Sequence, residues 1–460
     1  MPELSNLDRR DIETLVHPYT NLALHEEVGP LVIDRAEGVR VYDTQGRDYI
    51  EGLAGLWCTA LGYGNQELVE AARAQMARLP FAHLFGHKSH DVAIELAEKL
   101  KEISPAPAAR VLFCSGGSEA NDMQVKLTWY ANNARGRPER KKIIARRRAY
   151  HGVTVASGSL TGLPIVHEAF DLPLPQVIHV SCPDPYRDRE PGESEREFSE
   201  RLARELEDVI EHEGPETIAA FIAEPVMGAG GVVIPPEGYF EAIGRVLARY
   251  DIRIISDEVI TGFGRTGEMF GCQALGFTPT SISVAKAITS AYVPLGAITI
   301  EPELHEALLE QSRRLGVFGH GYTYTGHPVA CAVALKTLEI FEREDIPGQV
   351  RARAPKFGER LKRLEDHPLV GNVRGLGLIG GVELVADKAA RRLFDPGAGV
   401  GAAAARFAQE RGLLTRAVGG DIIALCPPLI ISEEDIDEMF DRLERALDDT
   451  HAWVQREGLS

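Results

Sequence analysis

The chain has 460 residues, with 50 Lys and Arg against 68 Asp and Glu, so its formal net charge is −18 at pH 7. This acidic excess argues against a nucleic-acid-binding protein, which needs a cationic surface. With 44% hydrophobic and 26% charged residues, the composition is typical of a globular protein with more than one domain.

The cysteines and the first residues of the sequence bear on the cellular compartment of the protein. The six cysteines are scattered without a Cys-x-x-Cys pair, which disfavours a disulfide framework and a zinc ribbon. Residues 1–10 contain no apolar segment of the length of a secretory signal, and no run approaches the roughly 18 apolar residues of a spanning helix. We therefore expect a cytoplasmic protein that does not bind membranes.

The first predicted element is an antiparallel ribbon over residues 31–50. Val39, Val41 and Tyr49 alternate with polar residues, and Thr44-Gln45-Gly46 supplies a turn between them.

The middle of the chain alternates between strand and helix patterns. Helical periodicity begins near Ser118 and again after Gly238. Five short β-branched segments are typical of strands buried on both faces, at residues 110–114, 142–145, 218–223, 252–256 and 281–285. This alternation predicts an α/β fold with a mostly parallel sheet.

The end of the chain has a different pattern. Helical segments after about residue 330 precede an apolar, glycine-rich stretch over 370–384, and Ser432 caps a predicted closing helix. We predict a large domain over residues 60–330 and a smaller α+β domain assembled from residues 1–59 and 331–460.

Polar residues follow three consecutive predicted strands. These are Glu224, Asp257 and Lys286, separated by 33 and 29 residues, close to the roughly 30 residues of a strand–helix–strand unit. Because ligands of parallel sheets bind at the carboxyl ends of strands, the spacing predicts a shared pocket. The alternative is that each charge only begins a solvated loop.

Two further segments are compatible with a phosphorylated ring. Gly116-Gly117-Ser118 lies between a strand and a helix, where glycines admit a ligand and the helix N-terminus favours an anion. A plain capped helix would use the same residues. Tyr150, in Ala-Tyr-His-Gly, either covers a flat ring or packs in the core. The adjacent Arg146-Arg147-Arg148 is most simply a solvated basic patch.

A phosphate cradle, a stacking aromatic, a carboxylate and a lysine together are what pyridoxal 5′-phosphate (PLP) requires. Over nearly its whole length the sequence resembles the class III, fold-type-I aminotransferases of the ω-amino acid or amine:pyruvate kind. The matching segments are residues 115–122 (SGGSEAND), 150–152 (YHG), 224–226 (EPV), 257–267 (DEVITGFGRTG), Lys286 and 321–328 (GYTYTGHP).

The resemblance implies roles for the cofactor site. Lys286 would form the Schiff base and move the proton between the substrate carbon and the cofactor, and Asp257 would pair with the ring nitrogen. The phosphate and the two ring faces would be contacted by Gly117, Ser118, Tyr150 and Val259. Thr323 would reach the phosphate of a neighbouring subunit, so the resemblance implies a homodimer, or a tetramer, with active sites at the interface.

It also implies a substrate pocket and an activity. Tyr19, Trp57 and Phe85 would line the pocket, and Arg416 would pair with a substrate carboxylate. Glu224 belongs with the cofactor residues, where it either pairs with Arg416 or braces the pocket. The expected reaction is ping-pong transfer of an amino group from an ω-amino acid or amine to a keto acid, with pyruvate the expected acceptor.

Parts of the sequence are also compatible with other functions. An aminomutase or a decarboxylating transaminase would use the same scaffold. The segment Gly375-x-Gly377-x-x-Gly380 matches a nicotinamide-binding fingerprint, but a strand pattern follows it where a helix is required. His83, His87 and His90 could share a helical face, yet no carboxylate or cysteine accompanies them at ligand spacing. We therefore expect no metal site.

Overall fold

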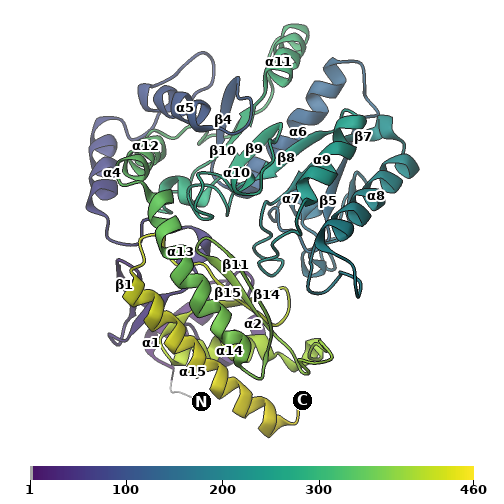
Figure 1. The fold of residues 1–460 in the computed structure, drawn as a ribbon. Helices are drawn as coiled ribbons and strands as arrows, with labels where there is room; N and C mark the ends of the chain where they lie inside the picture. Colours follow the sequence, from purple (N-terminus) through teal and green to yellow (C-terminus); the bar gives the residue numbers. More distant parts are fainter. Residues whose placement is uncertain (1–3, 460) are drawn as a thin grey trace.

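Seven strands form the central sheet of the structure, a computed structural model that describes residues 4–459 (Figure 1). Their order is β4 (Arg110–Cys114), β10 (Gly296–Ile300), β9 (Ser281–Val284), β8 (Arg253–Asp257), β7 (Ile218–Ala223), β5 (Lys142–Arg146) and β6 (Val177–Val180). Only β10 runs antiparallel to its neighbours. The predicted α/β class and mostly parallel sheet are confirmed.

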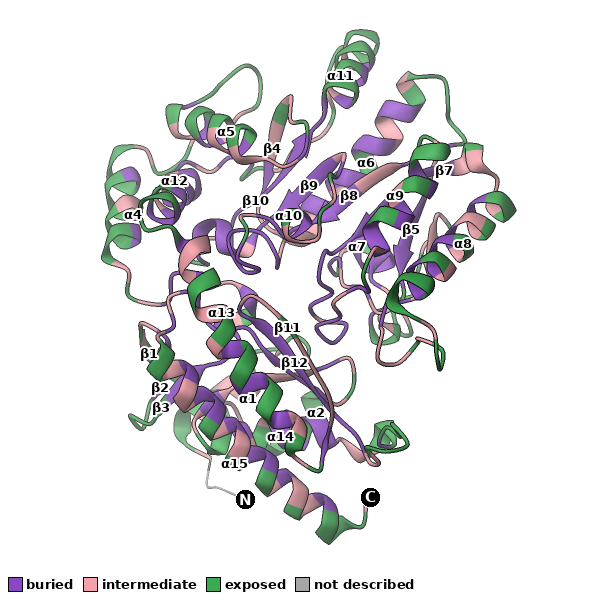
Figure 2. Ribbon diagram, viewed as in Figure 1, coloured by how far each residue is buried: buried purple, intermediate pink, exposed green. Residues whose placement is uncertain are grey.

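Helices cover both faces of this sheet, because successive residues of a buried strand point to opposite sides. On β7, Phe221 and Ala223 belong to the core beneath α8 and α9, whereas Ala220 and Ile222 pack with Val125 of α6. Figure 2 shows the strands buried between these layers. The helices around this sheet are α4 (Gln66–Arg78), α5 (Asp91–Ile103), α6 (Gly117–Ala134), α7 (Val155–Leu160), α8 (Glu195–Glu213), α9 (Tyr239–Arg249), α10 (Gly271–Ala274), α11 (Pro302–Leu315) and α12 (Pro328–Arg343), and the short α3 (Ala54–Trp57) precedes them in the chain.

A smaller part combines segments from both ends of the chain (Figure 1). One sheet has the order β1 (Ile33–Glu37), β2 (Arg40–Asp43), β3 (Asp48–Glu51) and β13 (Leu413–Leu414). A second has the order β11 (Val370–Leu376), β12 (Ile379–Leu384), β15 (Ile422–Leu425) and β14 (Arg416–Val418). The helices are α1 (Asn6–Thr14), α2 (Leu22–Val28), α13 (Ile346–Arg363), α14 (Val400–Glu410) and α15 (Glu433–Glu457).

Pairing between distant segments joins this smaller part. Strand β13 is parallel to β3, and Arg40 forms ion pairs with Asp435 at 2.9 Å and Glu438 at 2.6 Å. The predicted assembly from both termini is therefore confirmed, whereas the boundaries at residues 59/60 and 330/331 stay predictions. Within residues 4–459, no helix combines the length and apolar character needed to cross a membrane.

The glycine-rich stretch over 370–384 is an antiparallel hairpin of β11 and β12. Its turn contains Gly377 with φ of +62°, a conformation that favours glycine. A nicotinamide fingerprint must connect a strand to a helix, so the hairpin gives no support to the oxidoreductase hypothesis.

Candidate active site

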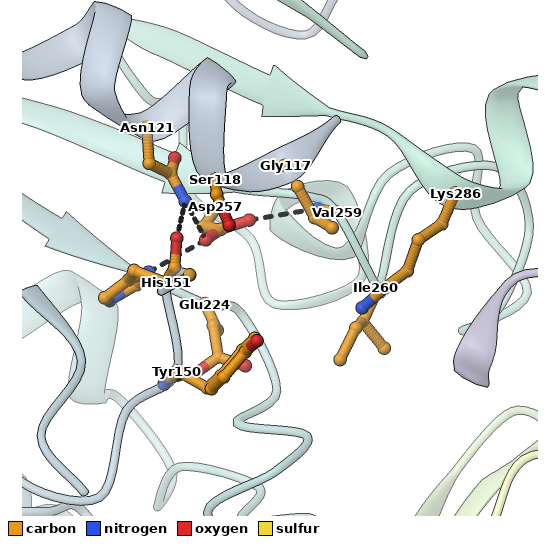
Figure 3. A pocket seen from close by; sticks show the side chains of 11 residues that line it. Gly117, Ser118, Asn121, Tyr150, His151, Glu224, Asp257, Val259, Ile260 and Lys286 are labelled. Carbon is orange, nitrogen blue, oxygen red and sulfur yellow. Dashed lines mark hydrogen bonds and ion pairs between the residues drawn. The ribbon is translucent and has the colours of Figure 1, made fainter. Parts of the chain in front are cut away.

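Three adjacent strands place the predicted polar residues at one edge of the sheet. Asp257 is the last residue of β8, Glu224 directly follows β7, and Lys286 begins the short 3-10 helix η3 (Lys286–Thr289) after β9. Figure 3 shows their side chains around a common pocket. Its volume is about 130 Å³, and its other lining residues are Gly117, Ser118, Asn121, Tyr150, His151, Gly152, Val259 and Ile260. The three residues that follow consecutive strands therefore line one pocket, as their spacing predicts.

The Asp257 carboxylate is buried and held by three donors. Oδ2 accepts hydrogen bonds from Asn121 Nδ2 at 2.7 Å and His151 Nδ1 at 2.8 Å, and Oδ1 accepts one from the Val259 amide at 3.1 Å. Such contacts fix the orientation of the carboxylate. Sequence reasoning gave Asn121 and His151 no role, although both lie inside the matched motifs.

The Lys286 amine lies in an environment that disfavours its charge. Burial lowers the pKa of Lys286, and the nearby acidic groups of Cys58, Asp257 and Glu224 oppose this effect. The Nζ atom is 5.4 Å from the centroid of the Trp57 ring. The residue also has φ of +52°, and non-glycine residues held in this region cluster at functional sites.

The opposite end of the pocket is the start of α6. No side chain caps this helix, so its first-turn amides and dipole remain available for an anion. Ser118 Oγ accepts a hydrogen bond from the Val153 amide at 3.3 Å. A Cβ atom at Gly152, where φ is +131°, would lie 2.6 Å from that Oγ. Glycine is therefore required for this close approach.

The residues present fit PLP. Two buried polar atoms beside the pocket, Asn121 Oδ1 and His151 Nε2, have no partner within the described residues. A carboxylate that can pair with a ring nitrogen and a primary amine face the same space, next to an uncapped helix N-terminus. Tyr150 and Val259 both line that space, as expected for residues that flank a ring.

A second cavity, of about 790 Å³, adjoins the first and shares Tyr150, Ile260 and Lys286 with it. Three of the four predicted substrate residues line this larger cavity: Tyr19, Trp57 and Arg416. The Arg416 guanidinium carbon is 5.2 Å from the Tyr19 ring centroid, and the Tyr19 and Tyr150 rings meet edge to face at 6.3 Å.

Phe85 and Thr323 are not brought to these cavities within one chain. Both are exposed and line neither cavity. They belong to segments that meet in the fold, because a Cβ atom added at Gly321, two residues before Thr323, would lie 2.9 Å from the Phe85 ring.

Glu224 contacts backbone amides. Its Oε1 accepts from the Tyr150 amide and its Oε2 from the Gly228 amide, both at 3.0 Å. Burial raises the pKa of this carboxyl. Of the two interpretations considered from the sequence, this geometry favours bracing of the pocket over pairing with Arg416.

The interpretation of residues 146–148 as a solvated patch is wrong for two of the three arginines. Arg146 is completely buried, with Nη2 donating to the Glu224 carbonyl at 2.5 Å. Arg148 forms an ion pair with the buried Asp184 at 2.7 Å. Only Arg147 is exposed.

The segment that contains His83, His87 and His90 is not helical, so these side chains do not share a helical face. They lie between α4 and α5, where the His90 ring accepts from the Ala93 amide at 3.3 Å and contacts the Gly326 carbonyl at 2.8 Å. His83 and His87 are exposed. These positions agree with the interpretation as surface and packing residues.

Known proteins resemble this chain in both sequence and structure. The family model for class III aminotransferases matches residues 23–447. The chloroplastic gamma aminobutyrate transaminase 3 of Solanum lycopersicum is 49% identical over 442 residues, which cover 96% of this chain and 85% of that protein.

The chain is also similar to solved structures. The omega transaminase of Pseudomonas jessenii in complex with PMP has 52% identity and a TM-score of 0.96, over 98% of this chain and 99% of that one. A thermostable omega transaminase variant, engineered for asymmetric synthesis of enantiopure bulky amines by replacing a tryptophan, a phenylalanine and an arginine, has 51% identity and a TM-score of 0.96. That match covers 98% of this chain and 100% of the variant. The chain therefore belongs to the class III aminotransferases and is a PLP-dependent enzyme of that family.

Proposed function

We propose that this aminotransferase moves the amino group of an ω-amino acid or amine to a keto acid, with pyruvate as the acceptor. The observation that carries the proposal is the meeting of Lys286 and Asp257 in a pocket that opens into a larger cavity lined by Arg416. The names of the relatives support it, because one is a gamma aminobutyrate transaminase and others are omega transaminases.

The cofactor residues have separate tasks. PLP, when bound, supplies the electron sink that makes cleavage of a C–H bond possible. Lys286 Nζ would hold the cofactor and would also be the base that takes up and returns the proton of the substrate carbon. Asp257 keeps the ring nitrogen protonated, and His151 and Asn121 keep Asp257 in place.

The remaining contacts position the cofactor. Gly117 and Ser118, at the start of α6, bind the phosphate through the helix N-terminus. Tyr150 and Val259 flank the ring, and Glu224 holds the Tyr150 backbone through its amide. A rigid pocket of this kind orients the C–H bond that must break.

Substrate selection belongs to the larger cavity. Arg416 binds a substrate carboxylate through a bidentate ion pair, while Tyr19 and Trp57 provide apolar walls. The engineered relative supports this assignment. Its substitutions replace a tryptophan, a phenylalanine and an arginine, and the residues of these types that we assign to substrate binding are Trp57, Phe85 and Arg416.

We further propose a homodimer in which Phe85 and Thr323 complete the partner's site. Both residues are exposed in the single chain. Phe81 and Tyr324 beside them are exposed too, with ring centroids 6.1 Å apart. Exposed aromatic residues clustered in this way are typical of an interaction surface.

A donor panel tests the proposal. GABA, β-alanine and (S)-1-phenylethylamine are each incubated with pyruvate or 2-oxoglutarate, and the amino acid product is quantified. Lys286→Ala is expected to lose all detectable transfer, whereas Lys101→Ala, on an exposed face of α5, keeps it. Alanine formed without CO₂ separates transamination from a decarboxylating reaction, and an isomerised donor without keto acid consumption would indicate an aminomutase. Retained transfer in Lys286→Ala would refute the mechanism.

The cytoplasmic location stays a prediction. The six cysteines are free in the structure, as expected in a reducing compartment, although two tomato relatives are described as chloroplastic and mitochondrial.

A further inference from the structure

Three side chains near the start of the chain converge outside the active site. Asp11 lies on α1, His25 on α2, and His17 in the segment between the two helices. Their potential ligand atoms, one from each side chain, all lie within 4.8 Å of one another. No motif predicts this cluster, because the residues are spread over 15 positions without ligand spacing.

The geometry of the cluster is that of a partly formed ligand set. Both imidazoles approach the same oxygen, with His17 Nε2 at 2.8 Å and His25 Nε2 at 3.1 Å from Asp11 Oδ1. The two rings are 4.1 Å apart between centroids and inclined by 35°. The exposed fractions of the side chains are 16% for Asp11, 29% for His17 and 9% for His25.

These donors match the preferences of zinc. Zn²⁺ binds imidazole nitrogen and carboxylate oxygen at about 2.0–2.2 Å in a tetrahedral arrangement, which separates ligand atoms by about 3.3 Å. The two separations between an imidazole Nε2 and Asp11 Oδ1, 2.8 and 3.1 Å, are shorter than this by a few tenths of an ångström. All three ligand atoms lie within 4.8 Å of one another, so small side-chain movements would bring them around one ion. Two imidazoles disfavour Mg²⁺ and Ca²⁺, which take oxygen ligands.

We propose that Asp11, His17 and His25 bind a divalent transition-metal ion, with Zn²⁺ the best fit and water as the fourth ligand. This site goes beyond the proposed function, and it departs from our expectation that the protein has no metal site. A metal binds the lone pair of each Nε2 atom, so the proton that each Nε2 donates to Asp11 Oδ1 must move to Nδ1 of the same ring, or leave to water if Nδ1 is already protonated.

The ion would clamp the chain next to the substrate cavity. His17 is followed by Pro18 and Tyr19, and Tyr19 has φ of +51° and lines the larger cavity. Leu15 and Val16, before His17, are 60% and 82% exposed. A metal that ties His17 to both α1 and α2 would therefore restrict the segment that carries Tyr19.

Zinc titration of the untagged, EDTA-treated and dialysed holoenzyme tests the site. We expect about one Zn²⁺ per chain by calorimetry and by elemental analysis, with no comparable binding of Mg²⁺. Asp11→Asn keeps an oxygen at the same position but removes its charge, and should weaken zinc binding at least about tenfold, since even outer-shell partners of a metal contribute roughly 10–100-fold. His17→Gln, at the most exposed of the three positions, should weaken zinc binding to a similar extent.

His212→Gln, an exposed histidine at the end of α8, is the matched control and accounts for zinc bound to the cofactor or the surface. Chymotrypsin cleavage near Leu15 and Tyr19 gives a second readout, and zinc should slow it in the wild type but not in Asp11→Asn. Zinc binding of equal strength in all variants, no binding at all, or stoichiometric binding without slower cleavage would overturn the proposal.

Discussion

Asp257 shows how the buried environment of one side chain sets its chemistry. Three hydrogen bonds hold its carboxylate in the wall of the pocket. In the proposed mechanism its negative charge keeps the cofactor ring protonated, which matters most when electrons move into the ring. The loss of this charge should therefore affect turnover more than cofactor binding.

Asp257→Asn tests this distinction. Asparagine keeps the size and one oxygen acceptor but cannot stabilise a protonated ring nitrogen, so kcat should fall by about 10²–10³-fold. The dissociation constant of PLP, measured on the same preparations, should rise far less. Parallel losses of turnover and cofactor affinity would show that the carboxylate only holds the cofactor.

Arg416 should separate substrates by their charge. In Arg416→Leu, a donor with a carboxylate loses a charge-assisted ion pair worth about 1.5–3 kcal/mol, so the KM for GABA should rise by about 10–100-fold. The KM for (S)-1-phenylethylamine, which has no carboxylate, should change little.

The measurement is the donor half-reaction alone, because the keto acid acceptor also carries a carboxylate. It is followed by the absorbance change as the cofactor passes from its aldehyde to its amine form. Arg313→Leu, on an exposed turn of α11, is the control. An equal rise in KM for both donors would place Arg416 outside substrate recognition.

At the scale of elements, the turn after β3 contains residues with positive φ, and one of them lines the substrate cavity. Ala54, Gly55 and Trp57 have φ of +47°, +66° and +59°, and Trp57 forms part of the cavity wall. Glu51, at the end of β3, accepts a hydrogen bond from the Leu53 amide at 3.3 Å and contacts the Tyr63 hydroxyl at 3.4 Å. A buried carboxylate thus anchors this turn.

Glu51 should give the stability of the protein a pH dependence. Burial raises its pKa from 4.5 to about 7, against the hydrogen bonds that favour the charged form. Between these two values the folded state keeps a proton that the unfolded chain has lost, so stability falls as pH rises through this window. The shift corresponds to about 3 kcal/mol at most.

Glu51→Gln should remove this loss, because glutamine stays neutral and keeps an oxygen for the Leu53 amide. Its melting temperature should equal that of the wild type at about pH 4, exceed it increasingly between pH 4.5 and about pH 7, and keep a constant excess above that. Glu139→Gln, at an exposed position, should show no such trend. A constant difference across the pH range would contradict the raised pKa.

Sequence patterns predicted elements well where local rules apply. The five predicted strands of the sheet are present within about one residue, because buried parallel strands read as short apolar runs. Strands β6 and β10 were not predicted. Strand β6 lies at the edge of the sheet and contains a polar residue, His179, within a short apolar segment. Strand β10 begins with a glycine and directly follows loop residues, so its apolar segment was not recognised as a separate strand.

Patterns failed where contacts join distant segments. The hydrogen bonds of Asp257 to Asn121 and His151 span 136 and 106 positions, and burial of Arg146 depends on Glu224 and the aromatic residues of α9. No local periodicity reports such contacts. The convergence of Lys286, Asp257 and Glu224 was predictable only because the strand–helix unit repeats with regular spacing.

At the scale of the whole molecule, one chain supplies an incomplete version of the proposed site. Lys286 and Asp257 line the pocket, but Thr323 is exposed and lines neither cavity. In a dimer with twofold symmetry, a residue at the edge of one chain can complete the site of the other. This arrangement makes a specific prediction for hybrid dimers.

Two inactive variants should restore activity to each other. Lys286→Ala removes the amine of its own site, and Thr323→Asp would place a negative charge beside the phosphate of the partner's site. In a hybrid dimer isolated with two different affinity tags, the Lys286→Ala chain still offers an intact Thr323 to the partner that retains Lys286. That one site should work, so the hybrid should show about half the activity of the wild-type dimer, because twofold symmetry gives each dimer two equivalent sites. If Thr323 served its own chain, each chain of the hybrid would carry one defect and the hybrid would be as inactive as either parent.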